Sequence, residues 1–378
     1  MSGSLSSLYG GRGIAIARGD GSRVFDSCGN EYLDFFNGHG AALFGHSNET
    51  LIRALKDASE GVWSCGAGFE SSVREELADE LASLIGGGRV FFTNSGTEAI
   101  EAALKLAAVL RPGRKRILAC RRAFHGRSCG ALSVTFNPKY RAPFASLIPH
   151  AEHLNPEALA EHIDNDTFAV FVEPVQGEGG VFPIEPEVGR AISEACRANG
   201  AILIADEVQT GLGRCGAPLA APLAGLDPDI TCVAKGLAGG LPAGAVLWKK
   251  ELGDFPPHSH GSTYGGNELV CSVALAAMKL LKDENFSKKA LNLGELLRSE
   301  IRKIESPHIK DVRGMGLLNG IELDIPSLDV VKALQAAGLL SLAAGPRVLR
   351  FLPSFAASEE DIRLGAKKLA ETLNGNAI

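Results

Sequence analysis

Three short segments of the chain place chemically active residue types where an apolar run ends. Asp206 follows the run Ile202–Ala205, and Lys235 follows the run Ile230–Ala234. Residues 94–98, Asn-Ser-Gly-Thr-Glu, end a third apolar run and open a helical pattern. A carboxylate at a strand end can hold a positive charge, and a partly desolvated lysine is a nucleophile. A helix start that contains glycine suits a phosphate, because its first N–H groups are unpaired.

Each segment also has an ordinary explanation. Ser95 followed three residues later by Glu98 is a common helix cap. Asp206 would fit an acidic surface loop, and Lys235 an exposed turn. The combination is more informative, because pyridoxal phosphate needs a phosphate cradle, an acid on its pyridine nitrogen and a lysine for a Schiff base. Together the three segments indicate a pyridoxal-phosphate site.

Apolar β-branched runs alternate with helical patterns through the middle of the chain. We expect strands at 90–93, 117–120, 168–172, 201–205, 230–234 and 243–248, and helices at 97–110 and 187–199. Continuous apolar strands separated by helices are typical of a mostly parallel sheet that is buried on both faces. The predicted fold class is α/β, and ligands of such sheets bind outside the carboxyl ends of the strands.

The two ends of the chain have a different pattern. Residues 14–35 contain short alternating segments with turn signals, and two long helical patterns begin near residue 269. A glycine-rich strand region, a helix, the strand 348–352 and a final helix from Ser358 follow. We therefore predict three parts: residues 1–50, which pack on a small domain; residues 51–268, a large cofactor-binding α/β domain; and residues 269–378, a small α+β domain.

The composition excludes several classes of protein. The 38 basic and 44 acidic side chains give a net charge of −6, which argues against a nucleic-acid partner. The hydrophobic share of 45% argues against disorder. No apolar run reaches the roughly 18 residues that span a bilayer, and the first residues do not resemble a signal peptide. We expect a cytoplasmic protein without membrane partners.

Cysteine, histidine and glycine patterns exclude further sites. The eight cysteines are widely spaced without a C-x-x-C pair, which favours reduced thiols. The pairs His150/His153 and His258/His260 lack completing ligands, so no metal site is expected. Residues 211–216 match G-x-G-x-x-G, but they neither follow a strand nor open a helix, so they do not predict a dinucleotide site. Many of the 45 glycines in the chain should mark turns and close approaches to a ligand.

Seven strings in this order resemble the class III pyridoxal-phosphate aminotransferases of fold type I, and the acetylornithine/ornithine aminotransferase subgroup in particular. The resemblance extends from about Gly13 to Ala370. The matching strings are Asn94–Glu98, Ala123–Arg127, Glu173–Gly180, Asp206–Arg214, Ala234–Gly236, Ser262–Asn267 and Arg350–Pro353.

The resemblance implies a role for each matching position around the cofactor. Lys235 would carry the cofactor as a Schiff base and move the proton between the substrate Cα and the cofactor C4′. Asp206 would keep the pyridine nitrogen protonated. The other cofactor-binding positions would be Ser95, Gly96 and Thr97 at the phosphate, Phe124 on the ring face, Gln209 at the ring hydroxyl and Glu173 as outer support. Thr263 would reach the phosphate of the neighbouring subunit, which implies a homodimer with shared active sites.

The resemblance also implies how two substrates share one pocket. Arg127 would bind an α-carboxylate through a bidentate fork. With an ω-amino donor bound, Glu178 would neutralise Arg350. With glutamate or 2-oxoglutarate bound, Arg350 would be free for the α-carboxylate and Arg127 would take the distal one.

Three segments depart from the family pattern. Residues 45–49 read Gly-His-Ser-Asn-Glu where Gly-His-x-His-Pro is frequent, Glu268 stands where proline is usual, and residues 63–69 lack the expected aromatics. These segments would border the donor side of the pocket. We predict transfer of an ω-amino group from N-acetylornithine, or a close N-acyl or ornithine-like donor, to 2-oxoglutarate. The alternatives are an ornithine, 4-aminobutyrate or lysine-pathway aminotransferase, and a non-catalytic cofactor-binding protein.

Overall fold

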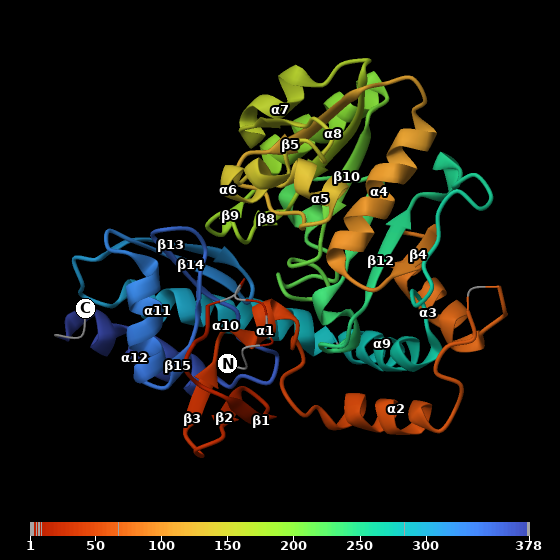
Figure 1. Cartoon of the computed structure of the whole chain (residues 1–378). Helices are drawn as coiled ribbons and strands as arrows, with labels where there is room; N and C mark the ends of the chain where they lie inside the picture. Colours follow the sequence, from red (N-terminus) through yellow and green to blue (C-terminus); the bar gives the residue numbers. More distant parts are fainter. Residues whose placement is uncertain are drawn as a thin grey trace.

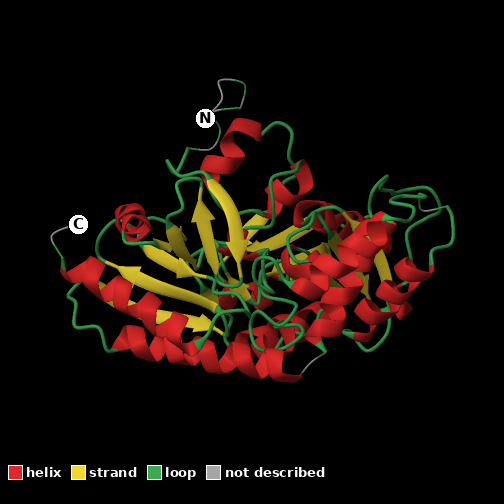
Figure 2. Cartoon of the chain, turned by 90° about the horizontal axis from the view of Figure 1, so that it is seen from below, coloured by secondary structure: helices red, strands yellow, loops and turns green. Residues whose placement is uncertain are grey.

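The computed structural model describes Ser4, Ser6, Leu8 and residues 10–66, 68–282 and 284–375. None of the helices in these ranges is long and apolar enough to cross a membrane. Strands lie at the centre of the molecule with helices packed around them (Figure 2).

A seven-stranded sheet forms the middle of the chain. Its strands are β4 (Arg89–Thr93), β5 (Arg116–Cys120), β6 (Glu152–Leu154), β7 (Thr167–Val172), β10 (Ile202–Asp206), β11 (Ile230–Val233) and β12 (Gly244–Trp248). Their order is β4-β12-β11-β10-β7-β5-β6. Every neighbouring pair is parallel except the two that involve β12, which runs antiparallel to β11 and β4. The predicted α/β class with a mostly parallel sheet is therefore confirmed.

Helices cover both faces of this sheet, which is why its strands are continuously apolar. On β7, Ala169 and Phe171 pack in one core with α4 (Gly96–Leu110) and α5 (Cys129–Val134). Val170 and Val172 point to the other core, with α7 (Pro156–His162) and α8 (Pro186–Asn199). In Figure 1, α4 crosses one side of the sheet, and α7 and α8 lie at the top.

Two smaller sheets contain the strands from the ends of the chain. One has the order β1-β2-β3-β15 and the other β13-β14-β17-β16. The first joins the N-terminal strands to a C-terminal one, because β3 pairs with β15 in parallel. The strands are β1 (Ile16–Asp20), β2 (Arg23–Asp26), β3 (Glu31–Asp34), β13 (Ile309–Met315), β14 (Leu318–Leu323), β15 (Leu339–Leu340), β16 (Leu342–Ala343) and β17 (Val348–Phe351). The domain boundaries at residues 50 and 268 stay a prediction.

Further helices lie along the chain, and several of them enclose a shared apolar core. They are α1 (Asn37–Gly40), α2 (Glu49–Ser59), α3 (Ser72–Ser83), α6 (Pro138–Arg141), α9 (Glu268–Leu281), α10 (Glu284–Arg302), α11 (Ser327–Ala336) and α12 (Glu359–Asn374). The largest core cluster joins residues from α9, α10, α11 and α12 to the face of β11 and β12. In Figure 1, α2 lies at the lower edge beneath α9.

A buried arginine joins the parts of the chain that surround the site. Arg214 is 1% exposed, and its guanidinium donates to the backbone carbonyls of Gly40, Leu317 and Pro353. Burial lowers its pKa to about 10. These carbonyls come from the N-terminal segment, from the turn between β13 and β14 and from the segment after β17, so Arg214 joins all three to the segment that follows β10.

The turn after β10 contains a second buried ionisable residue, Glu207. Its environment predicts that the stability of the fold depends on pH. The Glu207 carboxylate accepts hydrogen bonds from the Thr210 hydroxyl and the Ala221 N–H. Burial raises its pKa from an ordinary 4.5 to about 7. Because the pKa of Glu207 is higher in the folded than in the unfolded protein, Glu207 contributes about 3 kcal/mol to the free energy of unfolding at low pH. This contribution is fully present below pH ~4.5 and is lost as the pH rises through ~7.

We expect Glu207→Gln to remove that pH dependence. The free energy of unfolding of the wild type relative to this variant should fall by about 3 kcal/mol between pH ~4.5 and ~7. Urea denaturation across this range measures the difference. Glu161→Gln, at an exposed position of α7, is the matched control and should leave the slope unchanged. Parallel curves for the wild type and Glu207→Gln would contradict the assignment.

Candidate active site

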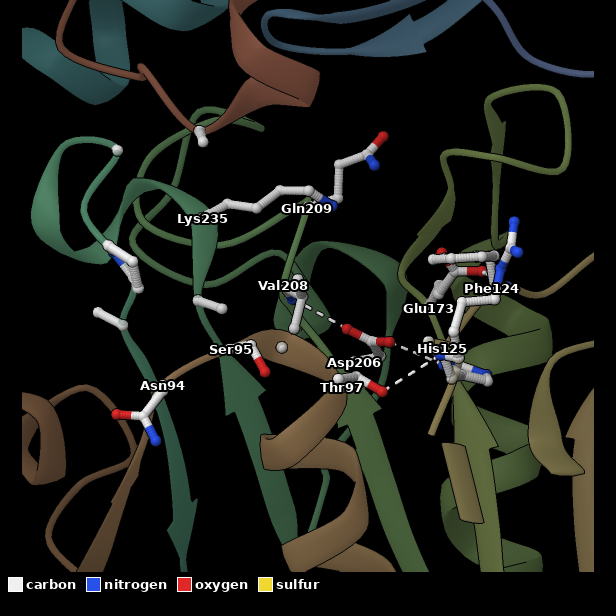
Figure 3. Close-up of a pocket in the computed structure, with 18 of the residues that line it drawn as sticks. Asn94, Ser95, Thr97, Phe124, His125, Glu173, Asp206, Val208, Gln209 and Lys235 are labelled. Atoms are coloured by element: carbon white, nitrogen blue, oxygen red, sulfur yellow. Dashed lines mark hydrogen bonds and ion pairs between the residues drawn. The ribbon is translucent and has the colours of Figure 1, made fainter. Parts of the chain in front are cut away.

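A cavity of about 490 Å³ lies at the carboxyl ends of β10 and β11. Asp206 is the last residue of β10, and Lys235 follows β11 by two residues. Both line the cavity together with residues 94–97, the segment predicted to hold a phosphate. Figure 3 shows the Lys235 side chain extending toward Gln209, with Asp206 beneath them. The three segments that the sequence singled out therefore meet at one cavity.

The start of α4 forms one wall of the cavity. Ser95 caps the helix, and its hydroxyl accepts from the Glu98 N–H at 3.3 Å. The N–H groups of Gly96 and Thr97 occupy the first helical turn, where no carbonyl precedes them within the helix, so they face an anion favourably. The Thr97 hydroxyl accepts from the N–H groups of Arg127 and Ser128. Ser95 is thus both an ordinary helix cap and part of the predicted phosphate-binding cup, by which we mean residues 94–97 at the start of α4.

Gly126 keeps the second wall close to this cup. Its φ is +129°, and a Cβ at this position would lie 2.3 Å from the Thr97 hydroxyl. We expect Gly126→Ala to displace Thr97 and to weaken retention of a phosphate-bearing cofactor at least about tenfold, whereas Gly113→Ala should not. Gly113 also has a positive φ, but a Cβ there would meet open space. Cofactor release during dialysis, followed by absorbance, measures the difference; equal release from both variants would contradict the prediction.

Asp206 is oriented by two hydrogen bonds at the floor of the cavity. His125 Nδ1 lies 2.7 Å from one carboxylate oxygen, and the Val208 N–H donates to the other at 3.0 Å. The side chain of His125 is fully buried, and its Nε2 has no hydrogen-bond partner within the described residues. With its own carboxylate 5% exposed, Asp206 provides a fixed negative charge for a cation above it.

Lys235 combines a strained backbone conformation with a lowered pKa, as a nucleophilic lysine does. It begins a 3-10 turn (Lys235–Ala238) in a left-handed conformation, φ +36°, that non-glycine residues adopt rarely. Such strain at a cavity persists only when the surrounding structure imposes it. Burial lowers the pKa of its amine, although the negative charge of Glu178 opposes the shift. A lowered pKa makes the neutral, nucleophilic amine more accessible.

Phe124 and Glu173 form the opposite side of the cavity (Figure 3). The Glu173 carboxyl accepts from the Phe124 N–H at 3.1 Å. Burial and the nearby Asp206 raise its pKa well above the ordinary value. Glu173 thus positions the backbone that presents the Phe124 ring, as its predicted supporting place implies.

Two oppositely charged residues, Glu178 and Arg350, form a pair near Lys235 but do not line the cavity themselves. Arg350, on β17, is fully buried and donates to Glu178 at 2.6 Å and to Gln209 at 2.9 Å. Burial alone would raise the pKa of Glu178, but the positive charges of Arg350 and Lys235 outweigh it and lower the pKa. The predicted pair of Glu178 and Arg350 is therefore present and charged. Gln209, predicted at the ring hydroxyl, contacts Arg350 and also lines the cavity.

The turn that carries Glu178 is held from both sides. It connects the short strands β8 (Val175–Gln176) and β9 (Phe182–Pro183). Arg313 of β13 donates twice to the Gly180 carbonyl. The guanidinium groups of Arg313 and Arg122 lie 3.8 and 4.3 Å from the Phe182 ring centroid. This clamp keeps Glu178 beside Arg350.

One of the predicted cofactor-binding residues lies outside the cavity. Two residues that line the cavity and contact Asp206 were not predicted from the sequence. Thr263 is exposed and does not line the cavity, so its predicted reach to a neighbouring subunit stays a prediction. Sequence reasoning gave no role to His125 or Val208, although both stand inside matching strings. The signal was available for Val208, because it lies between Asp206 and Gln209 and an apolar residue there can face a ring.

The residues present fit pyridoxal phosphate. The cup at the start of α4, the amine of Lys235 and the fixed charge of Asp206 match its phosphate, its aldehyde and its pyridine nitrogen. Within the described residues no group of three or more His, Cys, Asp or Glu side chains could hold a metal ion. The fold and the site thus define a pyridoxal-phosphate-dependent enzyme of fold type I.

Comparison with known proteins defines the family more closely. The model of the class-III aminotransferases matches residues 9–373, so this chain belongs to that family. It is 38% identical to the acetylornithine aminotransferase of Bacillus subtilis, over 98% of this chain and 97% of that protein. It is also 38% identical to the [LysW]-aminoadipate semialdehyde/glutamate semialdehyde transaminase of Sulfurisphaera tokodaii, over 98% of both chains. An ornithine aminotransferase structure from Toxoplasma gondii, with pyridoxal phosphate at partial occupancy in its active site, matches with a TM-score of 0.94 and 34% identity. It covers 98% of this chain and 92% of that one.

Proposed function

We propose that this aminotransferase moves the ω-amino group of N-acetylornithine, or of a close N-acyl or ornithine-like donor, to 2-oxoglutarate. The products are the semialdehyde and glutamate, formed in two half-reactions. The observation that carries the proposal is the Glu178–Arg350 pair at 2.6 Å beside Lys235, with Arg127 on the cavity wall and no carboxylate partner for it among the described residues.

Bound pyridoxal phosphate supplies an aldehyde and an electron-accepting ring for the amino group. Lys235 would attach the cofactor and move the proton at the substrate carbon, while Asp206 would keep the ring nitrogen protonated. With the donor bound, Glu178 neutralises Arg350, so that the uncharged arm of the donor faces no free cation. Arg127 then binds the α-carboxylate of the donor.

The acceptor has a second carboxylate, which needs both arginines. Rotation of Glu178 away from Arg350 would free a buried guanidinium for the α-carboxylate of 2-oxoglutarate, while Arg127 takes the distal carboxylate. A bidentate arginine fork suits each contact. Breaking a buried ion pair is costly unless another anion replaces the carboxylate, which favours exchange only when a dicarboxylate enters.

A second candidate donor is a lysine-type ω-amine, whose transamination gives an aminoadipate semialdehyde. Relatives named for that semialdehyde and relatives named acetylornithine aminotransferase share the same 38% identity with this chain. Glu268, which stands where proline is usual in the family pattern, forms an ion pair with Arg74 at 2.6 Å and accepts from the Cys65 N–H. Cys65, Arg74 and Glu268 do not line the cavity beside Lys235.

A donor panel tests the proposal. Purified holoenzyme with 2-oxoglutarate is given N-acetylornithine, ornithine, 4-aminobutyrate or an N-acylated lysine, and glutamate formation is followed. We expect the highest kcat/KM with N-acetylornithine or its close analogue. Preference for free ornithine, 4-aminobutyrate or the lysine derivative would replace the proposal by the corresponding alternative. We also propose a homodimer, in which Thr263 contacts the neighbouring subunit's phosphate; sedimentation velocity measures the mass.

A further inference from the structure

An aromatic ring behind the cavity wall contacts the predicted carboxylate-binding arginine. The Arg127 Cζ atom lies 3.5 Å from the ring centroid of Tyr140 and 5.6 Å from that of Phe124. The two rings meet edge to face, with centroids 6.3 Å apart and planes at 85°. Arg127 and Phe124 line the cavity, whereas Tyr140 stands outside it.

Hydrogen bonds hold the segment that carries Arg127 against the segment that leads to Tyr140, independently of the side chains of Arg127, Phe124 and Tyr140. Phe136 N–H donates to the Ala123 carbonyl at 2.9 Å. The Thr135 hydroxyl accepts from the His125 N–H and donates to the Gly126 carbonyl. The loop that carries Arg127 is therefore hydrogen-bonded to the segment between α5 and α6.

A short capped helix fixes the Tyr140 ring. Asn137 caps α6 with its side chain, which accepts from the Lys139 N–H at 3.0 Å. Pro138 follows at the first helical position, where its fixed φ suits the helix. The Tyr140 ring is thus presented by a defined turn rather than by a free loop.

The face and the edge of the Arg127 guanidinium have different surroundings. Its face is occupied by the Tyr140 ring, whereas its in-plane N–H groups make no hydrogen bond or ion pair with any described residue. A carboxylate binds a guanidinium in its plane, and an aromatic ring binds its face, so the two contacts are compatible. The stack limits the rotation of a long, exposed side chain before substrate arrives, which lowers the cost of binding.

We propose that Tyr140 is a positioning residue that holds Arg127 ready for the distal carboxylate of a dicarboxylate substrate. This inference rests on the proposed function for the assignment of Arg127 to that carboxylate. It predicts selectivity, because an acceptor without a distal carboxylate gains nothing from a positioned Arg127.

The test compares 2-oxoglutarate with pyruvate as acceptors for one donor, using holoenzyme. Tyr140→Leu should raise KM for 2-oxoglutarate about five- to 30-fold, the equivalent of one cation–π contact, with little change in kcat. The KM for pyruvate should stay within about twofold. Tyr140→Phe should behave as the wild type, because the Tyr140 hydroxyl has no partner among the described residues. Phe144→Leu, a half-exposed aromatic just beyond α6, is the matched control.

Calorimetric binding of glutarate to the holoenzyme gives a readout without turnover. We expect weaker binding to Tyr140→Leu by the same factor, and no further loss when Tyr140→Leu is added to Arg127→Met. If both acceptors lose equally, or if the two substitutions add independently, the proposal is overturned. Absence of turnover by the wild type with every donor would sink the proposed function instead, while the glutarate titration would still decide the role of Tyr140.

Discussion

Lys235→Ala is expected to abolish transamination. In the proposed mechanism, removing the amine would take away both the covalent hold on the cofactor and the group that moves the proton. A positioned proton-transfer group alone contributes about 10²–10⁴-fold, so kcat should fall by at least about 10⁴-fold when both roles are lost. Lys235 has a left-handed φ of +36°, a strained conformation of the kind that clusters at active sites.

A chemical readout distinguishes loss of attachment from loss of fold. Borohydride reduction of the wild-type holoenzyme should fix the cofactor on the peptide that contains Lys235, as mass spectrometry can locate. Lys235→Ala should carry no such label while keeping the wild-type thermal transition to within a few degrees. Lys332→Ala, on an exposed face of α11, is the control and should be labelled and active. Normal turnover of Lys235→Ala would refute the mechanism.

The sequence predicted those parts of the site that belong to one sheet. Asp206 and Lys235 each end an apolar run, and β10 and β11 are parallel neighbours, so their carboxyl ends had to meet. The helix start at Ser95 was predicted for the same reason, because it follows β4. Strand and helix bounds agree within one or two residues where the apolar pattern is continuous.

Contacts that depend on folded loops could not be derived in this way. His125 reaches Asp206 only because residues 121–128 fold over the strand ends, and no periodicity in that loop predicts it. Arg350 comes from another sheet, 141 residues beyond Gln209. Its partnership with Glu178 was inferred from the resemblance and not from spacing. Tyr140 gave no sequence signal at all, because its position relative to Arg127 depends on the Thr135 hydrogen bonds.

Replacement of Asp206 by Asn separates the charge at the cavity floor from the shape of its side chain. The amide has nearly the same size and can still accept from one of its two donors, His125 or the Val208 N–H. It lacks the negative charge that, in the proposed mechanism, would hold a proton on the ring nitrogen. At an effective dielectric constant of ~20, two charges ~4 Å apart attract by about 4 kcal/mol, which corresponds to about three pKa units.

We therefore expect kcat of Asp206→Asn to fall about 10³-fold while the cofactor phosphate remains bound. Steady-state kinetics and the bound-cofactor content after gel filtration measure the two effects. Asp229→Asn is the control, because Asp229 is a partly buried aspartate just before β11, at the opposite end of the sheet from Asp206, where it accepts from the Leu203 N–H. That control should lose stability but keep kcat. If Asp206→Asn stayed within about tenfold of the wild type, the ring nitrogen would not need this carboxylate, and the pairing with His125 would have a structural role only.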